Sequence, residues 1–278
     1  MPELPEVETV VRRIRPALEQ LQIADLEVLD SRWSKPVDPR SFERQISGKL
    51  VVRVSRRGKY ILVGLDGGQT LVMHLRMTGT ILINPDQAVG HERAEFSMSD
   101  GSRLVFNDPR RFGTAELVST SDLDAWFDGR LGLEPFDDGF TDDHFFDLTR
   151  GRSAPLKSFL LDQKLIAGVG NIYADEALFR ARLHPQRRPL GLTRAECSRL
   201  RNGVIEALAA GIDAGGATID DFRNPDGAWG AYQSEFLVHR RESLPCPSCA
   251  QAIEKIKVGG RGTYFCPTCQ PTPARVKR

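Results

Sequence analysis

The first apolar positions of the chain recur at helical spacing. They fall on one face of a helix with 3.6 residues per turn and comprise Val7, Val10, Val11, Ile14 and Leu18. Pro5 suits the first turn of such a helix, where its missing N–H has no partner to lose. The pattern therefore predicts an N-terminal helix that contains all of these positions.

A different pattern follows, with short runs rich in β-branched and aromatic residues. The runs cover residues 50–54, 60–65, 70–75, 79–83, 95–98 and 103–106. Gly, Asp, Asn and Pro separate them, as turn residues separate strands. We therefore expect a β-sandwich or barrel over the first ~130 residues.

Helical periodicity returns in the second half of the chain. It predicts helices at roughly residues 142–149, 154–162, 172–181 and 193–212. Residues 121–147 carry nine acidic residues and one basic residue and mark a boundary between the two halves. Residues 214–236 are rich in Gly, Asp, Asn and Pro and predict a long loop, and loops of this length are commonly functional or disordered.

Composition changes this picture only through the distribution of charge. The net charge of the 278 residues is +1, but residues 237–278 hold eight Lys and Arg against two Glu. This asymmetry is compatible with nucleic-acid binding and equally with an ordinary solvated surface. Charged residues and glycines interrupt the apolar stretches and no signal pattern precedes them, so we expect a cytoplasmic protein with no membrane span.

Four of the five cysteines form two pairs, Cys246-Pro-Ser-Cys249 and Cys266-Pro-Thr-Cys269, separated by sixteen residues. This spacing is typical of a tetrahedral zinc site, and four thiolates leave no open position, so one structural Zn²⁺ is expected. The alternative is two redox-active pairs, which would need a βαβ context that the pattern lacks. Cys197 lies in a helical pattern and is expected in the core.

The segment between the cysteine pairs is rich in glycine and contains Arg261. The glycines allow a tight hairpin tip, and a guanidinium at such a tip suits phosphate binding. A solvated turn arginine is the alternative interpretation.

The chain opens with MPELPEVETV. Removal of Met1 would leave Pro2 with a secondary amine, which in its uncharged form can attack an electrophilic carbon and form an iminium. Glu3 can then transfer a proton, and the first-turn position of Glu6 favours its charge. Alternatively, Pro2 reflects ordinary processing, and Glu3 and Glu6 only cap the helix.

The opening string and several later motifs, in order along the chain, resemble the formamidopyrimidine-DNA glycosylase family of bacterial enzymes that remove oxidised purines from DNA. The later motifs are Arg57-Gly-Lys59-Tyr, His74-Leu-Arg-Met77-Thr-Gly, Asn107-Asp-Pro-Arg110-Arg-Phe112-Gly, Gly168-Val-Gly-Asn171-Ile-Tyr, Gly215-Gly-Ala-Thr-Ile-Asp-Asp-Phe222 and the four-cysteine finger.

The resemblance implies a catalytic role for four residues. Pro2 attacks C1′ of the damaged nucleotide and Glu3 is the general acid toward the sugar. Lys59 serves β-elimination and Arg261 serves δ-elimination. The Schiff base makes the C2′ protons acidic, so the 3′ phosphate can leave. The resemblance therefore implies a glycosylase that also cleaves the strand.

It also implies the DNA contacts. Met77, Arg110 and Phe112 fill the gap left by a flipped base, although Met77 and Phe112 would otherwise be taken as core side chains. Asn171 is expected to cap a helix and to touch the DNA backbone. The remaining expected DNA-binding residues are His74, His91, Arg152 and Lys157.

Two departures from the family pattern are present. Thr78 stands where some relatives carry a Glu that approaches the lesion, which leaves the base contacts open. Residues beyond Cys269 add Arg275, Lys277 and Arg278, which could add nonspecific DNA affinity or have no role.

The expected fold is α+β, with an N-terminal β-sandwich flanked by helices and a C-terminal helical domain with a helix-two-turn-helix and a four-cysteine hairpin. The expected parts are a catalytic domain 1–132, a linker and first helix 133–150, a DNA-binding domain 151–236 with a lesion-recognition loop 215–236, a zinc finger 237–271 and a basic tail 272–278. The expected partner is damaged double-stranded DNA, bound by a monomer without a small-molecule cofactor and associated with a bacterial nucleoid.

Three other functions remain open. An endonuclease VIII-like enzyme for oxidised pyrimidines would share Pro2 and Glu3 but usually differs at Leu4, and the Arg110/Phe112 pair favours the purine enzyme. A noncatalytic zinc-ribbon protein would leave Pro2 and Lys59 unexplained. An N-terminal-proline tautomerase would not need a zinc finger.

Overall fold

The computed structural model describes residues 1–85, 89–218 and 223–272, and these form two compact units. One unit consists of Met1–Asp128 with Ala214–Gln233, and the other of Gly129–Asp213 with Ser234–Arg278. Within the described ranges, no helix is both long and apolar enough to span a membrane. The predicted residues 275, 277 and 278 of the basic tail lie outside the described residues.

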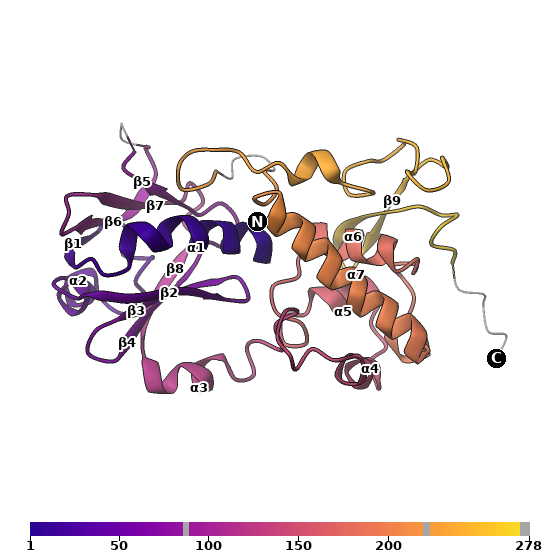
Figure 1. Cartoon of the computed structure of the whole chain (residues 1–278), viewed down its shortest axis with the longest axis horizontal. Coiled ribbons are helices and arrows are strands. Elements are labelled where there is room, and N and C mark those ends of the chain that lie inside the picture. Colours follow the sequence, from indigo (N-terminus) through magenta and orange to yellow (C-terminus); the bar gives the residue numbers. More distant parts are fainter. Residues whose placement is uncertain (86–88, 219–222, 273–278) are drawn as a thin grey trace. The chain divides into compact units, whose positions relative to one another are not determined.

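The first unit contains two antiparallel four-stranded sheets, as the predicted β-sandwich requires (Figure 1). One sheet has the order β1 (Ile23–Val28), β6 (Glu92–Met98), β7 (Arg103–Asn107) and β5 (Thr80–Ile83). The other has the order β2 (Val51–Arg57), β3 (Tyr60–Leu65), β4 (Gln69–His74) and β8 (Thr114–Ser119). Its helices are α1 (Leu4–Leu18), α2 (Pro39–Ile46) and α3 (Leu123–Phe127).

Helix α1 forms as its sequence predicts, because its apolar stripe belongs to the sandwich core. Val7, Val10, Val11 and Ile14 are 0% exposed, and the helix packs against β2. A capping box begins the helix, in which the Glu6 carboxylate accepts the N–H of the N-cap residue at 2.8 Å. Burial along the whole stripe fixes the start of the chain against the sheets.

Four elements of this unit were not predicted: β1, α2, β8 and the five-residue α3, whose buried residue is Phe127. Strand β1 contains a register shift between Ile23 and Asp25, which interrupts the alternation that identifies a strand. Helix α2 has eight residues, of which Phe42 and Ile46 are buried, so its periodic signal is short. Strand β8 alternates weakly, with buried Ala115 and Val118 separated by two half-buried residues.

The second unit contains the predicted helices and a hairpin. The elements are α4 (Asp142–Thr149), α5 (Leu156–Leu161), α6 (Asn171–Arg180), α7 (Arg194–Asp213), β9 (Glu254–Val258) and β10 (Arg261–Phe265). Glycines let α6 and α7 approach closely, because a Cβ at Gly203 would lie 2.7 Å from the Ala177 carbonyl oxygen. Cys197 of α7 is 0% exposed, as predicted for a core residue.

Most of the loop assigned to the helical domain by its place in the sequence groups instead with the first unit. Backbone contacts explain the grouping. The Ile83 N–H donates to the Pro225 carbonyl at 2.9 Å, and the Ala217 N–H donates to Glu6. Arg13 of α1 pairs with Asp226. The loop therefore belongs with the strands and helix it contacts.

We predict that Gly203→Ala destabilises the protein. Its methyl group would press on the Ala177 carbonyl, and overpacking of this kind costs roughly 1–3 kcal/mol. The gain in helix propensity offsets only about 1 kcal/mol of that loss. Urea unfolding should show a lower free energy of unfolding. Gly191→Ala is the matched control, because nothing lies within 4 Å of its added Cβ. Equal stability of both variants would contradict the close helix approach.

Candidate active site and metal centre

The start of the chain places Pro2 in a protected position. Pro2 is buried, whereas Met1 is 49% exposed. Glu3 and Glu6 are 3% and 2% exposed. An aminopeptidase can therefore reach Met1, and its removal would leave the Pro2 nitrogen as the chain start, directly before the buried Glu3.

Glu6 connects the start of the chain with the loop at residues 214–233. Its Oε2 accepts the Glu3 N–H at 2.8 Å, and its Oε1 accepts the Ala217 N–H at 2.7 Å. Gly216 has a φ of 80°, and a Cβ there would lie 3.1 Å from the Glu6 Cγ. Glycine at this position therefore lets the loop backbone reach the carboxylate.

Lys59 lies in a two-residue turn between β2 and β3. The turn starts at Gly58, whose φ of 57° favours glycine, and it is closed by the pairing of Arg57 with Tyr60. Lys59 is 5% exposed, and its charge contributes to the low pKa of His74. The turn thus holds a buried ammonium group near His74.

His74 is neutral over the physiological pH range. Burial, then the charges of Arg76 and Lys59, lowers its pKa to about 3. Its Nδ1 accepts the Arg76 N–H at 2.8 Å, which leaves the ring proton on Nε2. His74 can therefore contact a phosphate only through a neutral Nε2–H. Its observed hydrogen-bond partner is the backbone N–H of Arg76, directly before Met77.

The three predicted wedge residues lie on exposed loops of the same unit. Met77, between β4 and β5, is 37% exposed. Phe112, between β7 and β8, is 49% exposed, and the Arg110 guanidinium lies 4.9 Å from the centre of its ring. His91 is also exposed. Their exposure contradicts the alternative that Met77 and Phe112 are core side chains.

The predicted capping role of Asn171 needs correction. Gly170 is the N-cap of α6, and Asn171 is its first helical residue. Because Asn171 follows the cap position, its side chain turns elsewhere, and its Nδ2 donates to the Gly262 carbonyl of the hairpin at 3.2 Å.

Lys157 occupies a position that does not fit the predicted phosphate contact. It is 0% exposed, and its Nζ donates to the Asn171 carbonyl at 2.8 Å and to Asp175 Oδ1 at 2.5 Å. Asp175 is also fully buried and contacts His239 Nδ1 at 2.8 Å. A buried ammonium pays a large desolvation penalty unless it is paired, so this pairing holds Lys157 inside and fixes the start of α6. Arg152, in contrast, is exposed.

The four paired cysteines form one cluster. Their Sγ atoms lie within 4.8 Å of one another, with 3.8 Å between Cys246 and Cys269 and 3.5 Å between Cys249 and Cys266. A Zn–S bond of ~2.3 Å gives a tetrahedral S–S edge of about 3.8 Å. The cluster therefore fits one Zn²⁺, held by four sulfurs as a structural ion. None of the five cysteines, all within the described ranges, is in a disulfide.

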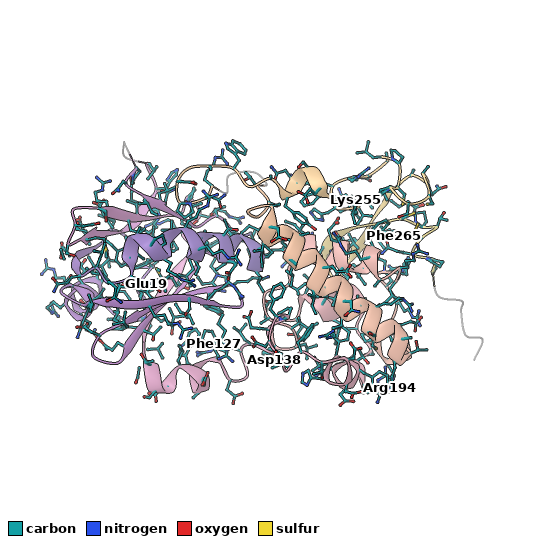
Figure 2. All side chains as sticks on the ribbon, in the orientation of Figure 1. Glu19, Phe127, Asp138, Arg194, Lys255 and Phe265 are labelled. Atoms are coloured by element: carbon teal, nitrogen blue, oxygen red, sulfur yellow. The ribbon has the colours of Figure 1, made fainter. Side chains whose placement is uncertain are left out.

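The hairpin between the cysteine pairs carries Arg261 as predicted. Gly259 and Gly260 have φ values of 55° and 80° and form the two-residue turn between Val258 and Arg261. Positive φ at both positions favours glycine. Arg261 is exposed, while Phe265 at the end of the same strand is buried. Figure 2 labels Phe265 and Lys255, one from each strand of this hairpin.

Three structural residues of the site were missed by the sequence analysis. Asp108 and Asp175 are 0% exposed, and Arg76 has a φ of 54°. Asp108 precedes a proline in a turn-like string, which is a signal for a turn residue. The burial of Asp175 in α6 depends on contacts with distant residues and has no local signal.

We predict that protonation of His74 lowers the free energy of unfolding as the pH falls. Its pKa is lowered from 6.5 to about 3 in the folded protein, so the unfolded chain binds the proton first. Its contribution is complete above pH 6.5 and is lost as the pH falls toward 3. Between pH 7 and pH 5 this loss is about 2 kcal/mol. In His74→Asn, the amide oxygen can still accept the Arg76 N–H but does not titrate, so the acid-induced loss should be about 2 kcal/mol smaller.

Urea unfolding at the two pH values measures this difference. His91→Asn, at an exposed histidine, is the control and should follow the unsubstituted protein. An equal acid-induced loss in His74→Asn and the unsubstituted protein would show that His74 does not carry the effect.

Comparison with known proteins gives consistent family matches. The N-terminal domain model of formamidopyrimidine-DNA glycosylase matches residues 1–115, its H2TH domain model matches residues 131–223, and the zinc finger found in FPG and IleRS matches residues 243–272. The formamidopyrimidine-DNA glycosylase of Pelotomaculum thermopropionicum is 44% identical over 97% of this chain and 99% of its own length.

Solved structures agree over the same span. The crystal structure of the MutM (FPG) protein from Thermus thermophilus has a TM-score of 0.87 and 43% identity, covering 97% of this chain and 98% of that one. A complex of a Lactococcus lactis FPG mutant with DNA containing Fapy-dG has a TM-score of 0.92 and 34% identity, covering 98% and 100%. With family models, relatives and structures matching along nearly its whole length, the chain belongs to the formamidopyrimidine-DNA glycosylase family.

Proposed function

We propose that this protein is a base-excision repair enzyme that removes oxidised purines from duplex DNA and then cleaves the strand at the abasic site. The observation that carries the proposal is the buried Pro2 behind an exposed Met1, in one unit with Glu3 and Lys59. An amine in a protected site can attack an electrophilic carbon, and the secondary amine of proline then gives an iminium. The complex of the Lactococcus relative with Fapy-dG DNA supports the choice of substrate.

The reaction begins when the Pro2 nitrogen attacks C1′ of the flipped nucleotide. The bond from C1′ to the base breaks, the base leaves with the proton that the Pro2 nitrogen loses, and Glu3 protonates the sugar oxygen as the ring opens. The iminium at C1′ makes the C2′ protons acidic. The Glu3 carboxylate, which has given up its proton, takes one of them, and the Lys59 ammonium donates to the 3′ phosphate as it leaves by β-elimination. Arg261, on the exposed hairpin of the second unit, assists loss of the 5′ phosphate by δ-elimination.

Flipping a nucleotide costs a few kcal/mol and leaves a gap in the stack. We assign the gap to Met77, Phe112 and Arg110, whose exposed side chains need no core contact to be broken before insertion. The exposed His91 and Arg152 are available to phosphates, with Asn171 at the start of α6. Loop 215–236 is assigned to reading the extruded base.

The competing oxidised-pyrimidine function is not distinguished by Leu4, which is 0% exposed in α1 and therefore serves packing. The purine assignment rests on the exposed Arg110 and Phe112 and on the Fapy-dG complex of the Lactococcus relative. A noncatalytic zinc protein would still leave the buried Pro2, Glu3 and Lys59 without a role.

We further propose that the protein acts as a monomer in the cytoplasm, on the nucleoid. One chain carries the nucleophile, the proton-transfer groups, the wedge residues and the zinc site. The chemistry described uses only side chains and the N-terminal amine, so it requires no small-molecule cofactor.

We predict that Pro2→Gly slows excision of 8-oxoguanine by ~10²-fold or more, because the flexible primary amine of an N-terminal glycine replaces the ring-constrained secondary amine of proline as the nucleophile. Single-turnover assays on duplexes with 8-oxoguanine or thymine glycol measure the loss and the lesion preference together. Pro271→Ala, at an exposed proline far along the chain, is the matched control and should retain full activity.

Two outcomes would contradict this prediction. Full activity of Pro2→Gly would remove the basis for a special role of proline. Faster excision of thymine glycol than of 8-oxoguanine by the unsubstituted protein would favour the pyrimidine enzyme.

A further inference from the structure

The carboxylate of Asp108 is buried beneath the loops that carry the wedge residues. It is 0% exposed and directly follows β7. Its Oδ1 accepts the Thr78 hydroxyl at 2.5 Å and the Arg110 N–H at 3.2 Å. Its Oδ2 accepts the N–H groups of Phe112 and Gly113, each at 2.7 Å. A carboxylate has about four acceptor sites, so these four donors saturate it.

These hydrogen bonds join two loops that are separate in sequence. Thr78 directly follows Met77 in the loop after β4, whereas Arg110 and Phe112 lie in the loop after β7. Asp108 itself is held by its backbone, because its N–H donates to the His91 carbonyl at 2.9 Å and its carbonyl accepts Arg93 Nε at 2.8 Å. One fixed side chain therefore sets the position of both loops.

Each apolar wedge residue follows a residue in the left-handed backbone region. Arg76 has a φ of 54° directly before Met77, and Arg111 has a φ of 60° directly before Phe112. Such conformations are unfavourable for residues with a side chain and persist only where surrounding contacts impose them. The Arg76 N–H is held by His74, and Arg111 Nε donates to Oδ2 of the buried Asp30 at 2.5 Å.

Glycines allow tight turns in both loops. A Cβ at Gly79 would lie 2.4 Å from the Leu75 carbonyl oxygen within its own loop, and a Cβ at Gly113 would lie 2.5 Å from the Phe106 ring and 3.3 Å from Asp108 Oδ2. Glycine at position 113 therefore lets its loop lie against the carboxylate. A loop that only connected two strands would not need this degree of constraint.

We propose that Asp108 and Thr78 form a positioning clamp that presents Met77, Arg110 and Phe112 as one preorganised wedge. The clamp rests on the proposed function, because its purpose is to enter the gap left by an extruded nucleotide. Side chains already in place lose less conformational freedom when they enter the duplex. The clamp also accounts for Thr78, since its hydroxyl serves the neighbouring loop through Asp108.

Thr78→Val tests the clamp, because valine has nearly the shape of threonine but lacks the hydroxyl. Thr78→Ser is the matched variant that keeps the hydroxyl. Each protein is assayed for single-turnover excision of 8-oxoguanine from a fully paired duplex and from a duplex with mismatches on both sides of the lesion. Mismatches lower the cost of extruding the base. The fluorescence of 2-aminopurine beside the lesion follows insertion of the wedge.

We expect Thr78→Val to slow excision and the fluorescence change by about tenfold on the paired duplex, and by less than about twofold on the mismatched one. Thr78→Ser should stay within about twofold of the unsubstituted protein on both. This split between substrates separates positioning from general loss of structure, which would slow both reactions equally.

Two results would overturn the clamp with the proposed function intact. One is that Thr78→Val excises 8-oxoguanine from the paired duplex as fast as the unsubstituted protein does. The other is that Thr78→Val lowers the excision rate equally on both duplexes. If the unsubstituted protein excised 8-oxoguanine from neither duplex, the proposed function itself would fail and the clamp would fail with it.

Discussion

The two hydrogen bonds accepted by the Glu6 carboxylate are the interaction on which the position of the chain's first residues depends. The carboxylate holds the backbone N–H of Glu3, next to Pro2, and the N–H of Ala217, which is 211 residues away in sequence. Chain termini are disordered by default unless something ties them down. Here the tie is double, because α1 is buried along its apolar stripe and Glu6 joins its first turn to the loop. With Pro2 as the proposed nucleophile, this double tie holds it in the fixed geometry that covalent attack requires.

Buried charged residues and exposed charged residues have different roles in this protein. Asp108, Asp175 and Lys157 are 0% exposed, and their hydrogen bonds join them to backbone groups and side chains of their own unit. They set the shape of turns and of the start of a helix. The cations that can reach a phosphate, such as Arg152 and Arg261, are exposed and lie in the second unit. The sign of a residue's charge therefore says less about DNA contact than its burial does.

The same contrast explains what could be read from the sequence. Helix α1 and the zinc cluster are predictable because their signals are local, a helical stripe and two short cysteine pairs. Lys157 and His74 are predicted DNA contacts, and no signal in the sequence indicates their burial or their partners on their own unit. Those partners are set by packing. Strand β1 was not predicted because a register shift breaks its alternation. The loop at residues 214–233 groups with the first unit because its backbone contacts Glu6 and Ile83.

The central claim is that the Pro2 nitrogen, held by α1 and Glu6, bonds to C1′ of the damaged nucleotide. The most direct measurement is tandem mass spectrometry of the peptide that carries the sugar after borohydride reduction of the protein on DNA containing 8-oxoguanine. The account predicts that the added mass lies on Pro2 at the start of the chain, with Met1 removed. An adduct on Lys59, or on a chain that still carries Met1, would contradict it.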